Sequence, residues 1–284
     1  MTMSRMSGPF CSAKDKRGRR RQMEIAPRQD APSLLGVPCR QVSLEAVLRR
    51  VLVVFMPVLA LFFVSPAIPQ EGPIFSTPEN AVAAYLDGVA QRDFGRVLAA
   101  TALEQLYLDF DFAAYVESLG GVTPSVPAPA SDPLLVEINK AAFAAGIAQQ
   151  VKMLTYFLLR RWDLTQDRIV PLKPGDGAAL ASALDPRRLD DLKLIRVGTP
   201  KPKLMGDQKY QEHAVQRAAF FGAEEFTERV ALIAFEGQTY EMGFQLMRFD
   251  AGWTISAQSS PVGNTSPAGV PWPMTPEEFD DLLK

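Results

Sequence analysis

The sequence predicts an α+β protein, in which N-terminal helices pack on a curved antiparallel sheet and a helical insertion separates the two. Apolar residues recur with helical spacing from residue 77 to about residue 162. Three segments after residue 226 show the two-residue alternation of strands, and glycine-containing connections of hairpin length join them. The composition, 47% hydrophobic and 22% charged over 284 residues, is typical of a globular protein and excludes wholesale disorder.

The charge is unevenly distributed along the chain. Residues 1–50 carry eleven Lys and Arg against four Asp and Glu, whereas residues 51–284 have a charge balance of -9. The net charge of the whole chain is -2. Residues 1–46 are polar, basic and rich in Pro and Gly, so we expect a disordered basic extension. Taken alone, its basic residues 14–21 could bind nucleic acid or an anionic membrane surface.

An uncharged run, Val51–Gln70, follows the pair Arg49 and Arg50. Its densest part has fourteen residues, about 21 Å of helix, which is short of the roughly 30 Å hydrocarbon core of a bilayer. This length favours a secretory signal at 47–67, cleaved after Ala67. The alternatives are an uncleaved anchor through residues 51–70 and a buried core helix. The cleaved signal and the uncleaved anchor both predict an exported protein, periplasmic or extracellular. Such a protein is free in the first case and held by one membrane helix in the second.

Helix signals are clearest at the start of the exported part. Thr77 is an N-cap with Pro78 at the first helical position, and the helix should end near Gln91. Asp93 can cap a second helix. Another long helix should run from Pro133, capped by Asp132, to about residue 162.

Strand signals dominate the last third of the chain. The expected strands are Leu192–Val197, Thr227–Phe235, Thr239–Phe249 and Trp253–Ser259, with a helix at Asp207–Phe221 after the first of them. One strand face is apolar and the other is mixed, which predicts a sheet with one covered side. Residues 260–284 read as a Pro-rich tail with a short terminal helix, whose capping box begins at Thr275.

Two segments resemble the NTF2-like, cystatin-like α+β cone. Residues 77–101, TPENAVAAYLDGVAQRDFGRVLAAT, resemble its opening helix pair, and residues 239–258, TYEMGFQLMRFDAGWTISAQ, resemble its closing hairpin. Both also resemble uncharacterised exported bacterial proteins. The resemblance implies a domain at 77–259 with a helical insertion at about 102–189, and a pocket enclosed by the cone. Because this fold hosts many functions, the resemblance names none.

The aromatic side chains of Tyr240, Phe244 and Trp253 are the candidate ligand-binding residues, because they could line such a pocket. The alternative is that they are buried in the core. His213 is the only histidine, and some enzymes of the resembled superfamily pair a His with an Asp as a base. His213 lies on a predicted helix, one position off its apolar face. The simpler interpretation is therefore that its side chain faces the solvent.

Acidic clusters are the remaining candidate sites. Glu224, Glu225 and Glu228 could divide acid and base roles, but such a group is more often a solvated connection. Asp185, with Asp190–Asp191, could form at most a weak calcium site. Both cysteines precede residue 40, so the exported part is expected to lack thiols. We expect no catalytic residue, no metal site and no cofactor.

These observations favour an exported, non-catalytic domain that binds a small apolar ligand or an envelope protein partner. That hypothesis predicts an aromatic pocket without convergent titratable groups. The alternative is a small NTF2-like enzyme of isomerase, dehydratase or hydrolase type, with His213 or a carboxylate as general base. Nucleic acid is not an expected partner, because the balance of -9 after residue 50 would repel phosphate.

Overall fold

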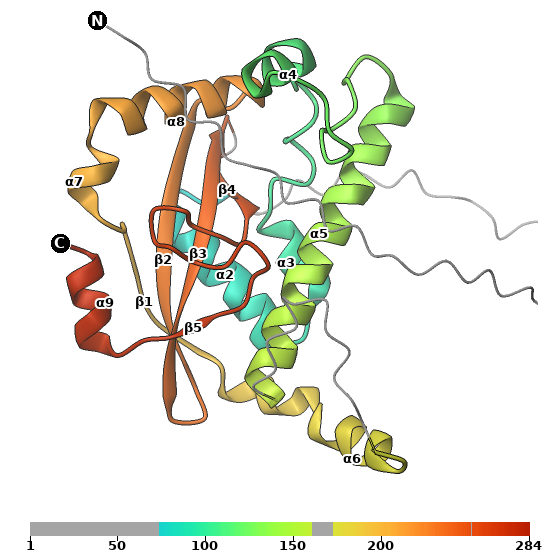
Figure 1. Ribbon diagram of the computed structural model, residues 1–284, viewed down its shortest axis with the longest axis vertical. Helices are drawn as coiled ribbons and strands as arrows, with labels where there is room; N and C mark the ends of the chain where they lie inside the picture. Colours follow the sequence, from blue (N-terminus) through green and yellow to red (C-terminus); the bar gives the residue numbers. More distant parts are fainter. Residues whose placement is uncertain (1–73, 161–172, 251) are drawn as a thin grey trace, which may run out of the picture. The chain divides into compact units, whose positions relative to one another are not determined.

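The computed structural model describes residues 74–160, 173–250 and 252–284 (Figure 1). The basic extension at 1–46, the signal or anchor at 47–67 and the uncharged run to Gln70 lie outside these residues. The described residues belong to one compact unit, 68–284. Within them, no helix combines the length and the apolarity that a bilayer crossing requires.

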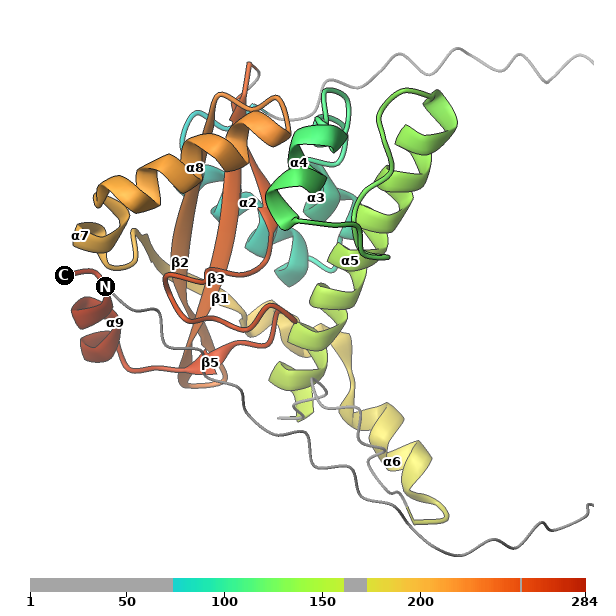
Figure 2. The same cartoon turned by 45° about the horizontal axis from the view of Figure 1, so that its top comes forward.

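The helical part opens with α2 (Pro78–Ala90) and α3 (Phe94–Ala99). Their predicted N-caps are confirmed, since Thr77 and Asp93 accept hydrogen bonds from backbone N–H groups of the first turns. The insertion follows as α4 (Phe112–Leu119), α5 (Pro133–Arg160), α6 (Asp176–Ala183) and the short 3₁₀ helix η1 (Pro186–Asp191). Figures 1 and 2 both place α5 beside the sheet, on the side of β4.

The sheet is antiparallel, with the strand order β1-β2-β3-β4 and β5 paired to β3. Its strands are β1 (Lys193–Gly198), β2 (Glu225–Phe235), β3 (Gln238–Phe249), β4 (Gly252–Ala257) and β5 (Trp272–Pro273). Two helices, α7 (Pro202–Met205) and α8 (Gln208–Phe220), join β1 to β2. Helices that precede and cover an antiparallel sheet confirm the predicted α+β class.

One face of the sheet packs against α2 and α5 and is here called the α2 face. Its core contains side chains from both helices and from alternate strand positions, among them Tyr85, Leu154, Ile233, Tyr240 and Phe244. Tyr85 meets Phe244 edge to face with ring centroids 5.6 Å apart. These large side chains are fully buried, so the α2 face is a continuous apolar core.

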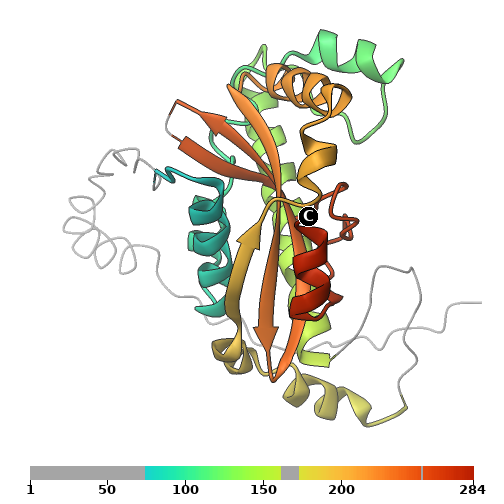
Figure 3. The ribbon, with the colours of Figure 1, turned by 90° about the vertical axis from the view of Figure 1, so that its left-hand side faces the viewer.

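The opposite face, here called the α8 face, is also covered, so the expectation of a single covered side was wrong. Figure 3 shows α2 on one side of the sheet and α8 and α9 (Pro276–Leu282) on the other. Eight consecutive residues of β3, 240–247, are buried for this reason. The two-residue alternation marks which residues share a face, but it does not show that a distant segment covers the mixed one.

The segment expected to be a Pro-rich tail forms part of this cover. Ser260 is fully buried, and Phe279 of α9 packs with Val230 and Leu232 of β2. The loop of residues 260–265 lies directly on Gly243 of β3, where a Cβ atom would come within 2.6 Å of the Ser260 Cβ atom. The predicted capping box of the terminal helix is confirmed.

Candidate functional site

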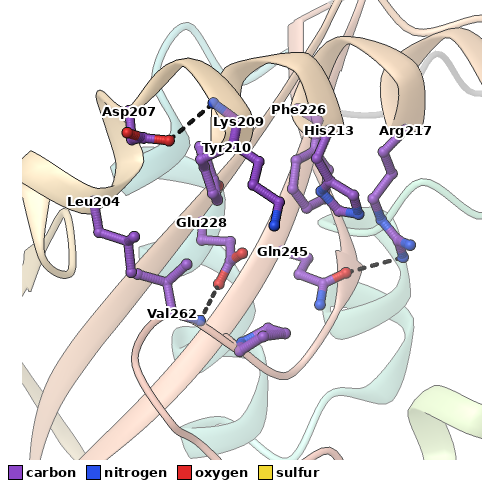
Figure 4. A pocket seen from close by; sticks show the side chains of 11 residues that line it. Leu204, Asp207, Lys209, Tyr210, His213, Arg217, Phe226, Glu228, Gln245 and Val262 are labelled. Carbon is purple, nitrogen blue, oxygen red and sulfur yellow. Dashed lines mark hydrogen bonds between the residues drawn. The ribbon is translucent and has the colours of Figure 1, made fainter. Parts of the chain in front are cut away.

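A pocket of about 530 Å³ lies between α8 and the sheet, and we call it the α8 pocket (Figure 4). Its walls come from α7 and α8, from β2 and β3, and from the 260–265 loop. The residues that line it are Leu204, Asp207, Lys209, Tyr210, His213, Arg217, Phe226, Glu228, Gln245, Pro261 and Val262. The α8 pocket thus combines segments that are far apart in the sequence.

Helix α8 supplies the polar wall of the pocket. Lys209, His213 and Arg217 are spaced i, i+4 and i+8, which places them on one face of the helix. Figure 4 shows all three side chains extending from α8 into the pocket. Asp207 begins the helix, since its Oδ1 atom accepts a hydrogen bond of 2.9 Å from the Lys209 backbone N–H. Ala214, on the adjacent face, is buried and holds the helix on the sheet.

Arg217 is the most constrained of these three side chains. Its Nη2 atom donates a hydrogen bond of 3.0 Å to Gln245 Oε1, and its guanidinium lies 5.3 Å from the centre of the Phe226 ring. Its Nε atom is buried without an acceptor among the described residues. Burial lowers the pKa of Arg217, because desolvation disfavours the charged form.

Glu228 lies in the floor of the pocket and is only 4% exposed. Its Oε2 atom accepts hydrogen bonds from Ser260 Oγ at 2.6 Å and from the Val262 backbone N–H at 3.0 Å. These two bonds fix the 260–265 loop as a wall of the pocket. Burial raises the pKa of Tyr210, and the nearby Glu228 carboxylate adds to the same shift.

Glu241 is a second buried carboxyl group on the α8 face, outside the residues that line the pocket. It is 3% exposed, and its Oε1 atom is buried without a partner in the described part of the chain. Desolvation raises the pKa of Glu241 to about 7, although the positive charge of Lys201 lowers it. A Cβ atom on Gly263 would lie 3.2 Å from Glu241 Oε1, so the same loop covers both carboxyl groups.

The three predicted ligand-binding residues lie on the other face. Tyr240 and Phe244 are fully buried in the core of the α2 face, and Trp253 packs partly buried against it. The Tyr240 hydroxyl donates a hydrogen bond of 2.8 Å to Gln238 Oε1. The structure therefore brings the three residues to one core, but none of them lines the α8 pocket.

His213 and Glu228 are the earlier candidates that the α8 pocket brings together. His213 is exposed, as the simpler interpretation had it, yet it lines the pocket, and its ring meets Phe226 with centroids 6.5 Å apart. Glu224 and Glu225 instead form exposed ion pairs with Arg248. Glu228 departs from the expectation of a solvated cluster, because the 260–265 loop covers it.

Asp185, Asp190 and Asp191 do not form the weak calcium site that the sequence left open. Asp185 pairs with Arg187, and Asp190 pairs with Arg92. Side-chain hydrogen bonds from Arg187 hold the pKa of Asp185 low, at about 2. Among the described residues, no group of three or more His, Cys, Asp and Glu side chains is placed to hold a metal ion.

Sequence reasoning did not identify Lys209, Tyr210, Arg217 or Gln245. A signal for the first and third was present, because Lys209, His213 and Arg217 repeat at intervals of four on a predicted helix. A second signal was Glu228, which takes an inward position in the alternation of Phe226, Glu228 and Val230. Neither signal shows that the two elements face each other.

Comparisons with known proteins give no family for this chain. No protein-family model matches the chain, and no curated protein matches it. Among solved structures, the chain is similar to the crystal structure of a cystatin-like protein from Ruminococcus gnavus ATCC 29149, with a TM-score of 0.47 and 19% sequence identity. The match covers 75% of this chain and 44% of that protein, so the chain spans less than half of its length.

Proposed function

We propose that this protein binds a small, largely apolar ligand in the α8 pocket. The observation that carries the proposal is an open volume of about 530 Å³ on a sheet face that is otherwise closely covered. Pockets for small molecules typically measure about 300–1,000 Å³ and combine apolar walls with a few placed polar groups. Here Leu204, Phe226 and Val262 supply apolar wall, and α8 supplies the polar groups.

Blocking the mouth of the pocket tests this proposal. Leu204 lines the pocket and is 50% exposed, so Leu204→Trp adds bulk at the rim without disturbing the core. Leu134→Trp is the matched control, because Leu134 on α5 is also exposed, at 66%, and does not line the pocket. The probe is N-phenyl-1-naphthylamine, a neutral apolar dye, titrated into the full chain.

We expect the wild type and the Leu134→Trp variant to bind the dye at one site with equal affinity. The Leu204→Trp variant should bind it at least about fivefold more weakly, equivalent to roughly 1 kcal/mol. Equal affinity of all three proteins would place the bound dye elsewhere and refute the pocket as the site.

Export of the folded unit is part of the same proposal. Its support is the uncharged run Val51–Gln70 behind Arg49 and Arg50 and the balance of -9 after residue 50. A fusion of alkaline phosphatase after Lys284 tests it, since that enzyme gains its disulfides and its activity only outside the cytoplasm. An envelope protein partner stays a prediction.

A small enzyme is the second candidate, because titratable groups do converge on the pocket. Glu228 lies in the floor of the pocket, and Ser260 and Val262 hold its Oε2 atom, an arrangement suited to a positioned general base. An isomerase or dehydratase removes a proton from carbon. Deuterium uptake from D₂O into phenylpyruvate, catalysed by the wild type and lost in Glu228→Gln, would favour this candidate over simple binding.

A further inference from the structure

We infer that the ligand of the α8 pocket carries a carboxylate group and that Arg217 binds it. This inference rests on the proposed function and specifies the class of ligand as a monocarboxylate with an apolar body. The inference rests on the charged side chains of the pocket, whereas the proposed function rests on the volume of the pocket.

Arg217 is a largely buried cation that forms no direct ion pair among the described residues, although the charge of the nearby Glu228 carboxylate acts on it. None of the ion pairs in the described part of the chain includes it, and its one side-chain hydrogen bond goes to the neutral amide of Gln245. Its buried Nε atom has no acceptor. A buried charge is costly unless it is paired, so the site is better satisfied when an anion occupies it.

The nearby carboxylates are already engaged. Glu228 directs Oε2 to Ser260 Oγ and to the Val262 backbone N–H. Asp207 caps the first turn of α8 at the opposite end of the pocket from Arg217 (Figure 4). The charge of Glu228 acts on Arg217, but neither carboxylate forms a direct ion pair with it, so the guanidinium keeps a donor for a ligand.

Two further donors face the same space. Lys209 and His213 have no side-chain hydrogen bond or ion pair among the described residues, and both extend from α8 toward the pocket (Figure 4). With Arg217 they form a row along one wall. Successive cationic or donor groups on one wall favour entry of an anion from solvent.

The apolar residues set the orientation of the ligand. Leu204 and Val262 lie at the end of the pocket near Asp207, whereas Arg217 and Gln245 lie at the other end (Figure 4). A ligand with its carboxylate at Arg217 would therefore extend its apolar body toward Leu204. The planar fork of a guanidinium matches the two oxygens of a carboxylate, which favours this anion over a neutral polar group.

The test compares 4-phenylbutyrate with 4-phenylbutan-1-ol, a neutral compound of nearly the same shape, by calorimetric titration of the full chain at pH 7. We expect the wild type to bind the acid about tenfold more tightly than the alcohol, since a hydrogen bond to a charged group is strong. Arg217→Gln should abolish this tenfold preference, which is read as the ratio of the two affinities within each protein.

Arg187→Gln is the matched control, because Arg187 is an exposed arginine outside the pocket, and we expect it to retain the preference. Every variant shares residues 1–73, so any binding there is common to all. Should Arg217→Gln fail to fold, Arg217→Lys replaces it, with an expected loss of about threefold because an ammonium group lacks the planar fork.

Equal affinities of the wild type for acid and alcohol would overturn the inference and leave the proposed function standing. A preference that persists in Arg217→Gln would also overturn it. If neither compound binds and N-phenyl-1-naphthylamine does not bind either, the proposed function fails, and the inference fails with it.

Discussion

The two faces of the central strands are built from different residues. On the α2 face, β2 and β3 contribute Ile233, Tyr240 and Phe244, which pack into an uninterrupted apolar core. On the α8 face, the same strands contribute Glu228, Glu241 and Gln245, all of them buried. Residues one position apart on a strand point to opposite faces, so a single pair of strands supports both environments.

This difference indicates a division of roles. Buried polar groups cost stability unless they are paired, and the α8 face retains unpaired atoms on Arg217 and Glu241. The α2 face carries the main core, so it can stabilise the sheet while the opposite face keeps a hollow and unmatched donors. Exceptions to complete polar pairing are expected to be concentrated at functional sites.

The largest expected effect comes from removing a large side chain on each face. Phe244→Ala, on the α2 face, should lower the free energy of unfolding by about 3–5 kcal/mol, because it leaves a cavity in a close-packed core. Phe226→Ala, beside the pocket, should cost only about 2 kcal/mol, since it enlarges an existing hollow. Urea unfolding of the full chain measures both changes in the free energy of unfolding. Equal losses for the two variants would contradict the proposed difference between a filled face and a hollow one.

A methyl group added to Gly243 should detach the cover of the α8 face. Its Cβ atom would overlap Thr265 Oγ1 and the Ser260 backbone nitrogen, so Gly243→Ala should cost about 1–3 kcal/mol. Gly177→Ala in α6 is the control, because nothing lies within 4 Å of its Cβ position, and it should stabilise by up to about 1 kcal/mol. Loss of the loop should also weaken dye binding, and unchanged binding by Gly243→Ala would separate the loop from the site.

The pH dependence of stability should show the buried carboxyl group on the α8 face. The pKa of Glu241 is raised from 4.5 to about 7, so between these pH values the folded state binds more protons than the unfolded state. Stability therefore falls as the pH rises from 5 to 8, by at least about 1 kcal/mol. Glu241→Gln should flatten this decline in stability, which is measured as the urea midpoint between pH 5 and 8. If the midpoint of this variant falls with pH as that of the wild type does, the decline does not come from Glu241.

The capping box of α9 gives the smallest expected effect. Thr275 accepts a hydrogen bond from the Glu278 N–H, while Glu278 accepts one from the Thr275 N–H. Thr275→Ala should cost about 1 kcal/mol, read from urea unfolding. Thr123→Ala, in an exposed loop, is the control and should change stability by less than about 0.5 kcal/mol.

The sequence predicts the helices and strands because caps and apolar periodicity are local signals. Thr77, Asp93 and Asp132 cap helices as expected, and the strand segments fall close to the observed bounds. It did not locate the α8 pocket, because the pocket depends on α8 crossing the sheet and on the 260–265 loop returning to it. Tyr240 and Phe244 are candidates because of their aromatic rings, and alternation alone does not tell which face of a strand the core fills.

The most direct test of the central claim is to locate a bound ligand on one of the two faces. A crystal of the full chain soaked with 4-(4-bromophenyl)butyrate would show the bromine by anomalous diffraction. We predict a single bromine site between α8 and strands β2 and β3, near Leu204, with the carboxylate at Arg217. A bromine site on the α2 face beside Trp253, or none within the α8 pocket, would contradict this account.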